Sequence, residues 1–165
     1  MAFEIERKFL IEYPDTETLE KFPDAKKIEM AQTYLISENG TTSRVRKRIS
    51  DGEVKYIFTE KLRINDLKCI ENEREVTADE YEELLKSADP ERKTVYKTRY
   101  CLPFEGRVVE VDIYPFWNDR AIAEVEMESE DEIVRLPEII KVIRDVTSEK
   151  AYKNASIAKH IPDNC

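Results

Sequence analysis

Short segments in which every second side chain is charged recur along this 165-residue chain, and they limit what it can fold into. The first segment covers residues 3–9. In an extended strand alternate side chains point to the same face. Glu4, Glu6 and Lys8 would therefore share one face, while the opposite face is apolar apart from Arg7. Two carboxylates beside an amine suit a divalent cation and the phosphate that it neutralises, whereas a solvated edge strand is the structural alternative.

Six further segments repeat this alternation. Their charged or polar members at alternate positions are Arg44, Arg46 and Arg48; Thr59 and Lys61; Glu71, Glu73 and Glu75; Lys97 and Arg99; Glu110 and Asp112; and Glu124 and Glu126. Most of these segments put apolar residues on the other face. A sandwich of such strands would turn the charges towards water. A closed barrel could instead turn them inward, with helices covering its apolar outside, and closure would remove exposed strand edges.

The charges of both signs would meet inside such a barrel. The acidic set is Glu4, Glu6, Glu71, Glu73, Glu110, Asp112, Glu124 and Glu126, and the basic set is Lys8, Arg44, Arg46, Lys61, Lys97 and Arg99. They make a poor dry core, because buried charges need partners. They suit a wet tunnel that holds divalent cations and a polyphosphate, since carboxylates bind the metal and basic side chains bind phosphate oxygens.

Turn and capping signals divide the remainder of the chain. The three glycines, Gly40, Gly52 and Gly106, each fall where a hairpin would turn, the first after Glu38-Asn39. A short helix is expected over residues 15–21. The capping box Thr77–Glu80 predicts a helix that ends near Asp89-Pro90.

Two more helices are expected nearer the C-terminus. A second capping box covers residues 129–132, and Ile139, Ile140 and Ile143 indicate a short helix after Pro137. A final helix is expected over residues 148–159. Trp117 is interpreted as a packing or loop residue, and the single histidine, His160, as a solvated tail residue.

Composition limits the class of protein. The length suits one domain, and no repeat or linker divides the chain. The net charge of −9 argues against nonspecific nucleic-acid binding, which rests on positive charge. Three widely spaced cysteines, Cys69, Cys101 and Cys165, indicate reduced thiols in a cytoplasmic protein. No segment has the apolar length of a membrane helix, no P-loop occurs, and one histidine makes a histidine-based zinc site unexpected.

The order and spacing of these motifs resemble the CYTH superfamily, also called triphosphate tunnel metalloenzymes, over about residues 2–159. The matching motifs are Glu4-x-Glu6-x-Lys8, Gln32-Thr33-Tyr34-Leu35, Arg44-Val45-Arg46, Thr59-Glu60-Lys61, Glu71-Asn72-Glu73, Lys97-Thr98-Arg99-Tyr100, Glu110-Val111-Asp112, Ala123-Glu124-Val125-Glu126, Val146-Thr147 and Tyr152-Lys153-Asn154. The chain departs from the family in two places. Cys69 and Ala151 stand where relatives often have basic residues, and Lys68 or Lys150 could compensate.

The resemblance implies an α+β, mainly antiparallel β fold: an eight-stranded closed barrel with a charged interior and helices outside, as one domain over residues 1–165. It also implies Mg²⁺ or Mn²⁺ as cofactor. The implied roles are catalytic for Glu4, Glu6 and Lys8; substrate-binding for Lys8, Arg44, Arg46, Lys61, Lys97 and Arg99; metal-binding for Glu4, Glu6, Asp112, Glu124 and Glu126; and supporting for Glu71, Glu73 and Lys150. Structural ion pairs are the alternative role for each of these residues.

Three functions remain open on the sequence. The first is hydrolysis of a small triphosphate, above all inorganic triphosphate to pyrophosphate and phosphate. The second is a class IV adenylate cyclase that converts ATP to cyclic AMP and pyrophosphate, and the third is a module that binds polyphosphate or nucleotide without turnover. The first is favoured because no purine pocket is evident. We expect a small-molecule partner, no nucleic acid or membrane, and a monomer or homodimer.

Overall fold

The computed structural model describes residues 2–38 and 40–162, so that Asn39 of the first expected turn and the third cysteine, Cys165, lie outside it. The strands of this part are β1 (Ala2–Glu12), β2 (Lys26–Leu35), β3 (Thr41–Ser50), β4 (Glu53–Arg63), β5 (Lys68–Val76), β6 (Val95–Phe104), β7 (Arg107–Ile113), β8 (Arg120–Glu126) and β9 (Val142–Asp145). The helices are α1 (Thr16–Lys21), α2 (Ala78–Leu85), a 3₁₀ turn η1 (Lys150–Tyr152) and α3 (Asn154–Ile157).

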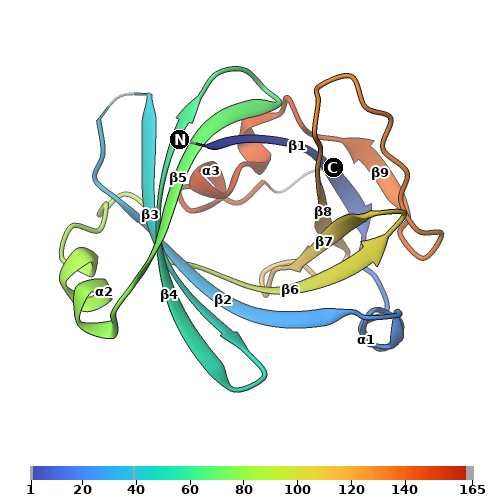
Figure 1. Ribbon diagram of the computed structural model, residues 1–165, viewed down its shortest axis with the longest axis horizontal. Helices are drawn as coiled ribbons and strands as arrows, with labels where there is room; N and C mark the ends of the chain where they lie inside the picture. The colour runs from blue at the N-terminus through green and yellow to red at the C-terminus, as the bar shows by residue number, and fades with distance from the viewer. Residues whose placement is uncertain (1, 39, 163–165) are drawn as a thin grey trace.

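Eight of these strands close into an antiparallel barrel in the order β1-β5-β4-β3-β2-β6-β7-β8, with β8 pairing again with β1. Figure 1 looks down this barrel, with α3 visible through its opening. β9 pairs with residues 9–11 of β1, beyond residues 2–5, which pair with β5. The predicted eight-stranded closed barrel is therefore confirmed. Most barrel strands carry charged residues on their inward face, because the period of two fixes which side chains share a face. The exception is β2, which turns Met30, Gln32 and Tyr34 inward and leaves Lys27 and Glu29 exposed.

Two tight turns set the register of neighbouring strands. Asp51 and Gly52 have φ angles of 51° and 76°, and Glu105 and Gly106 have 50° and 77°. Two successive positive φ angles are typical of the two-residue turn that matches the twist of a β-hairpin. The hairpins β3–β4 and β6–β7 therefore begin where the glycine signals predict them.

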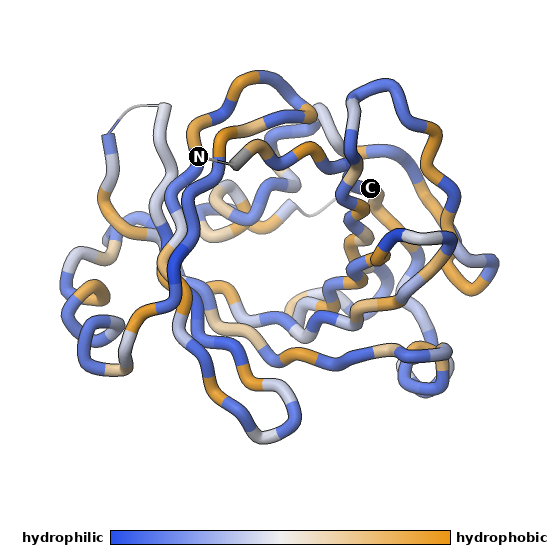
Figure 2. Tube along the Cα trace, viewed as in Figure 1, coloured by the Kyte–Doolittle hydropathy of each residue, from blue (hydrophilic) through white to orange (hydrophobic). Residues whose placement is uncertain are grey.

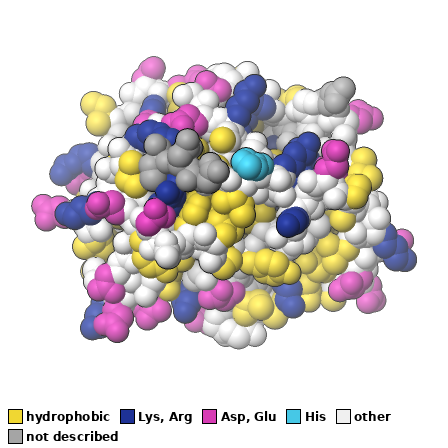
Figure 3. Space-filling view, turned by 180° about the vertical axis from the view of Figure 1, so that it is seen from behind, with side chains coloured by type: hydrophobic (Ala, Val, Ile, Leu, Met, Phe, Trp, Pro, Cys, Tyr) yellow, Lys and Arg dark blue, Asp and Glu magenta, His cyan; other side chains and the backbone are white. Residues whose placement is uncertain are grey.

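Apolar side chains on the outside of the barrel are covered by α1 and α2. Hydrophobic and hydrophilic residues alternate along the strands of the barrel (Figure 2). The α1 residue Leu19 is buried against the outer face of the β6–β8 region, and the α2 residue Tyr81 packs near Val45 and Val76. Thr77 caps α2 as predicted, since its Oγ1 accepts a hydrogen bond from the Glu80 N–H at 3.1 Å. The helix ends at Leu85, short of the expected Asp89. The face opposite that of Figure 1 shows acidic and basic side chains around a central group of apolar ones (Figure 3).

The helix predicted after Pro137 is wrong. Glu132 of the second capping box does accept hydrogen bonds from the backbone N–H groups of Glu128 and Ser129, but a turn follows rather than a helix. The chain then forms β9, because residues 9–11 of β1 lie beyond the reach of β5 and offer an edge that the β-branched pair Val142-Ile143 can join.

The final predicted helix is also interrupted. Lys153 adopts an extended conformation, with φ −74° and ψ 141°, which separates η1 from α3. An apolar cluster that includes Leu10, Trp117 and Tyr152 packs α3 against one end of the barrel. Trp117 is thus a packing residue, as predicted, and His160 is exposed. Within the described residues, no helix is both long and apolar enough to span a membrane.

Candidate active site

A cavity of about 470 Å³ occupies the interior of the barrel, and its wall is strongly charged. Ten lysines and arginines and seven glutamates line it, in a chain whose net charge is −9. The predicted site residues that line it are Glu4, Glu6, Lys8, Arg44, Arg46, Lys61, Glu71, Glu73, Lys97, Arg99, Glu124, Glu126 and Lys150. Positive charge is therefore concentrated locally, which is what an acidic protein needs in order to bind a polyanion.

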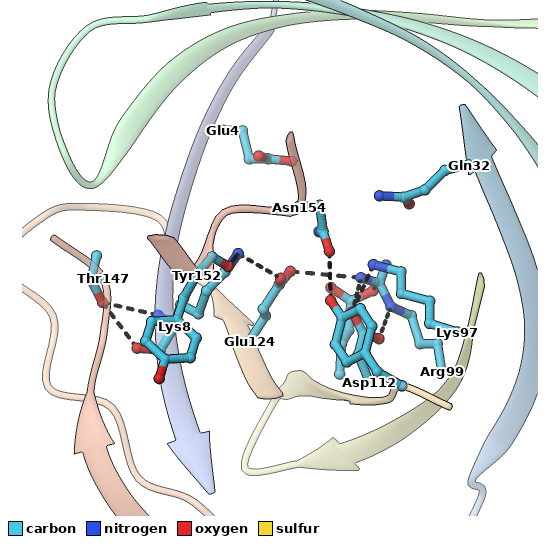
Figure 4. A network of polar contacts seen from close by, with 12 residues as sticks. Glu4, Lys8, Gln32, Lys97, Arg99, Asp112, Glu124, Thr147, Tyr152 and Asn154 are labelled. Carbon is cyan, nitrogen blue, oxygen red and sulfur yellow. Dashed lines mark hydrogen bonds and ion pairs between the residues drawn. The ribbon is translucent and has the colours of Figure 1, made fainter. Parts of the chain in front are cut away.

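Asp112, predicted as a metal ligand, lies behind this wall and is fully buried. Its Oδ1 accepts a hydrogen bond from Arg99 Nε at 2.7 Å, and its Oδ2 accepts from Lys97 Nζ at 2.7 Å (Figure 4). Burial opposes ionisation of this carboxyl, but the charges of Arg99 and Lys97 outweigh burial and lower its pKa. Asp112 thus binds two basic side chains with one carboxylate and fixes the direction in which they point.

Glu124 is also buried, but it reaches the cavity. It forms ion pairs with Lys8 Nζ at 3.3 Å and with Arg99 Nη2 at 3.6 Å. Lys8 Nζ in turn donates to the Tyr152 carbonyl oxygen at 3.1 Å, so Lys8 joins Glu124 to the segment that closes one end of the barrel (Figure 4). Although burial acts in the opposite direction, Lys8 and Arg99 hold the pKa of Glu124 well below its usual value. The carboxylate is therefore ionised and available to a cation.

Lys61 of β4 holds two further carboxylates, Glu71 from the neighbouring β5 and Glu4 from β1, which pairs with the far side of β5. Its Nζ lies 2.9 Å from Glu4 Oε1 and 3.3 Å from Glu71 Oε2. Burial raises the pKa of Glu4, but Lys61 and a hydrogen bond to Glu71 outweigh it and lower the pKa to about 2. Burial and the adjacent Glu4 raise the pKa of Glu71 to about 7. Glu4 is thus the charged member of this pair near neutral pH.

Glu6 and Glu126 face one another across the β1–β8 pairing. Neither forms an ion pair within the part of the chain that the structure describes. Burial, together with the negative charges of Glu124 and Glu4, raises the pKa of Glu6 to about 8. Carboxylates that repel one another without a counter-ion are the donor set that a divalent cation stabilises.

The described residues contain no group of three or more His, Cys, Asp and Glu side chains that converges as a ready-made metal site. Mg²⁺ is commonly held by one or two carboxylates together with substrate phosphates and water rather than by a complete protein cage. Glu6, Glu126 and the neighbouring Glu124 therefore fit a cation that is bound together with a phosphate chain.

Three arginines on β3 face the carboxylates from the other side of the cavity. Arg44, Arg46 and Arg48 all line it, and the buried Nε of each has no hydrogen-bond partner among the described residues. Burial and the positive charges of Arg44 and Arg99 lower the pKa of Arg46 to about 9. Guanidinium groups that crowd together with unused donors are suited to a polyanion, whose oxygens accept several hydrogen bonds at once.

The sequence prediction of the site missed three basic residues of the wall, Arg48, Arg63 and Lys153. Arg48 and Arg63 continue the alternation of β3 and β4, so the period of two could have identified both. Lys153 belongs to the Tyr152-Lys153-Asn154 motif, to which the family resemblance alone assigns no binding role. Lys68 does not line the cavity, because its ammonium group lies over the Phe3 ring at 4.4 Å, whereas Lys150 does line it.

No protein-family model matches the chain. Among curated proteins, the chain is 30% identical over 164 residues to the inorganic triphosphatase of Nitrosomonas europaea, which covers 96% of this chain and 99% of that protein. A crystal structure of the inorganic triphosphatase NE1496 superimposes with a TM-score of 0.59, at 28% identity and with 99% of each chain covered.

A more distant structure shows the same fold. HpAC1 from Hippeastrum, an adenylyl cyclase candidate described as having a dominant triphosphatase activity, has a TM-score of 0.52 and 15% identity and covers 76% of this chain and 80% of its own. Relatedness over nearly the full length of the Nitrosomonas protein, combined with the closed barrel and its charged interior, shows that the chain belongs to the CYTH superfamily of triphosphate tunnel metalloenzymes.

Proposed function

We propose that this protein is a metal-dependent hydrolase that cleaves inorganic triphosphate to pyrophosphate and phosphate. The observation that carries the proposal is the arrangement of one cavity wall against the other. Arg44, Arg46 and Arg48 present unused donors on one side, and Glu6 and Glu126 present carboxylates without counter-ions on the other. The near-full-length relative that is an inorganic triphosphatase supports the same reaction.

The basic residues bind and orient the phosphate chain in this proposal. Arg44 and Arg46 each offer two donors in one plane, which suits neighbouring phosphate oxygens. Lys97 and Arg99 are held in place by Asp112, so they contribute positive charge at fixed positions. Because these groups are already oriented, little reorganisation is needed as charge redistributes in the transition state. Lys61 and Lys8 complete the basic set.

Glu6, Glu124, Glu126 and Glu4 would hold Mg²⁺ or Mn²⁺. When bound, such a cation supplies charge neutralisation at phosphate oxygens and acidifies a coordinated water. Glu124 is ionised through Lys8 and Arg99, and Glu4 through Lys61, so both are available as ligands near neutral pH. Glu71 and Glu73 would orient basic side chains, since Glu71 pairs with Lys61 and Glu73 lies 3.9 Å from Arg46.

The site gives little support to the adenylate cyclase alternative. A cyclase must hold ribose and base as well as the phosphates. Tyr34 is the one aromatic residue among those that line the cavity, and it is 2% exposed, with its hydroxyl accepting a hydrogen bond from Gln32. Trp117 lies in the apolar cluster instead. No described aromatic face is therefore offered to a purine inside the barrel.

A substrate panel tests the proposed function. Inorganic triphosphate, ATP, thiamine triphosphate and pyrophosphate are incubated with Mg²⁺ or Mn²⁺, and phosphate, pyrophosphate and cyclic AMP are measured. We expect the highest kcat/KM for inorganic triphosphate and no cyclic AMP above background. Cyclic AMP as the main product from ATP would replace the hydrolase by a cyclase, and tight binding without turnover of any compound would indicate a binding module. We further propose a reducing, cytoplasmic setting, which the free thiols of Cys69 and Cys101 support.

A further inference from the structure

We propose that Arg63 is the specificity-determining residue that makes the cavity select an unsubstituted polyphosphate over a nucleoside triphosphate. This inference rests on the proposed function and assigns the selection to one end of the cavity. Arg63 is the last residue of β4, and its side chain lines the cavity although much of it is exposed. It therefore lies where a substrate can still meet solvent.

The basic residues at this end differ from Lys61, Lys97 and Arg99 deeper in the barrel. Lys61, Lys97 and Arg99 all have carboxylate partners at 3.3 Å or less. Arg63, Lys150 and Lys153 line the same cavity, and none of them forms an ion pair within residues 2–38 and 40–162. The polar contact of Arg63 is a long one, from Nη1 to the Asn65 carbonyl oxygen at 3.5 Å. Its guanidinium is thus free to take an anionic ligand.

The lowered pKa of Lys153 indicates an excess of positive charge at this end of the cavity. Burial, and next the positive charges of Arg63 and Lys8, lower its pKa to about 8, while Glu6 and Asp66 act in the opposite direction. Two basic side chains from separate segments, the end of β4 and the residue before α3, therefore repel each other across the cavity mouth. A terminal phosphate placed between them would remove that repulsion, whereas an uncharged sugar would not.

The same region offers nothing that rewards a nucleoside. Stacking on an aromatic face is the usual sequence-independent contact of a base, and the lining residues near α3 are Lys150, Lys153, Asn154, Ala155 and Ser156. Tyr114 uses its hydroxyl to donate to Asn154, and both Tyr114 and Tyr152 are buried in the apolar cluster. An additional negative charge is thus favoured here over a ribose and base.

Arg63→Gln and Arg63→Lys test the assignment, with Lys68→Gln as the matched control. Lys68 is also basic and lies just across the β4–β5 turn, but its ammonium contacts Phe3 outside the cavity. For each protein, kcat/KM is measured for inorganic triphosphate and for ATP. Equilibrium binding of both anions is measured in parallel by competition, so that the comparison does not depend on turnover.

The expected result is a change in the ratio of kcat/KM for inorganic triphosphate to kcat/KM for ATP. Arg63→Gln loses one charge-assisted contact, which should lower kcat/KM for inorganic triphosphate by about tenfold or more. The kcat/KM for ATP should change by less than about twofold. Arg63→Lys should recover most of the loss because it restores the charge. Lys68→Gln should leave kcat/KM for both substrates at the wild-type value.

Two results would overturn the inference. An equal loss for triphosphate and ATP would show that Arg63 binds a phosphate that both share, so that the nucleoside leaves the cavity at the opposite end, near Arg48 and Glu110. No loss for either would show that Arg63 faces only solvent. If the wild-type protein hydrolyses neither compound, the proposed function fails, and the binding ratios decide the role of Arg63 separately.

Discussion

Lys97 and Asp112 form an ion pair inside the barrel, with Nζ 2.7 Å from Oδ2 and both side chains without solvent exposure. Removing two charges from water is unfavourable unless each finds good partners. Asp112 satisfies this condition because Arg99 also donates to it through Nε and Nη2. The pair therefore holds two basic side chains of the cavity in fixed positions, and its own carboxylate is not left over for a metal.

Replacement of that carboxylate should destabilise the fold. Asp112→Asn removes the charge that compensates Lys97 and Arg99, and breaking a buried pair by changing one partner costs about 3–5 kcal/mol. The free energy of unfolding, measured with denaturant, checks this value. Glu83→Gln is the control, because its pair with Lys86 is exposed and such pairs contribute little. A loss in Asp112→Asn no larger than in the control would contradict the structural role.

Removal of a carboxylate that lacks a counter-ion should act on the metal instead of on stability. Glu6→Gln and Glu126→Gln take one ligand from the proposed cation site, so the Mg²⁺ or Mn²⁺ concentration for half-maximal activity should rise by about tenfold or more, a loss of about 1.4 kcal/mol in metal binding. Stability should hold or increase, because Glu6→Gln relieves repulsion by Glu124 and Glu4, and Glu126→Gln relieves repulsion by Glu4 and Glu73.

Glu75→Gln supplies the comparison for these two variants. Glu75 follows the same alternation on β5, but it is exposed and does not line the cavity. The Mg²⁺ or Mn²⁺ concentration for half-maximal activity of Glu75→Gln should match that of the wild-type protein. An unchanged metal requirement in both Glu6→Gln and Glu126→Gln would remove these residues from the cation site.

Loss of a β3 arginine should weaken triphosphate cleavage. Arg44→Ala or Arg46→Ala deletes a charge-assisted contact of about 1.5–3 kcal/mol, which corresponds to a loss of roughly tenfold to a few hundredfold in kcat/KM. Arg→Lys variants should recover part of it, since an ammonium cannot bind two oxygens in one plane. Lys47→Ala, directly after Arg46 and on the outer face of β3, should behave as wild type. Wild-type kinetics in both arginine variants would show that these side chains do not bind substrate.

The pH dependence of binding should carry the titration of Lys153. Its pKa is lowered to about 8 by burial and by the nearby Arg63 and Lys8. Only the protonated amine attracts phosphate, so its contribution is present below that pKa and is lost as the pH rises through it. The ratio of kcat/KM for the wild-type protein to that for Lys153→Arg should fall over about one pH unit on either side of the pKa. A ratio independent of pH would show that Lys153 does not contact the substrate.

The alternation of charge was enough to predict most of the barrel. Which residues share a strand face depends only on the local period of two, so residues such as Glu4, Arg46 and Glu124 could be assigned to the interior without knowing the pairing. The closed order of strands followed from the family resemblance, and the structure confirms it. The glycines at two hairpin turns could likewise be read from the sequence, because a positive φ angle is a local requirement of such turns.

Features that depend on distant partners could not be predicted in this way. The segment that forms β9 carries a helix-like signal, and its strand conformation depends on an edge left free by β5, far away in the sequence. Asp112 and Glu124 both face inward by their period, but only the packed structure shows that Asp112 lies behind Lys97 and Arg99. Depth inside the barrel, which decides between a supporting residue and a ligand, is absent from a one-dimensional pattern.

Phosphorus NMR of inorganic triphosphate incubated with the protein tests the central claim most directly. With Mg²⁺ or Mn²⁺ present, the triphosphate signals should be replaced by equal amounts of pyrophosphate and phosphate. EDTA should stop the reaction, and Glu124→Gln should slow it severely while remaining folded. Persistence of triphosphate in the presence of either metal, or unchanged cleavage in EDTA, would contradict a metal-dependent triphosphatase.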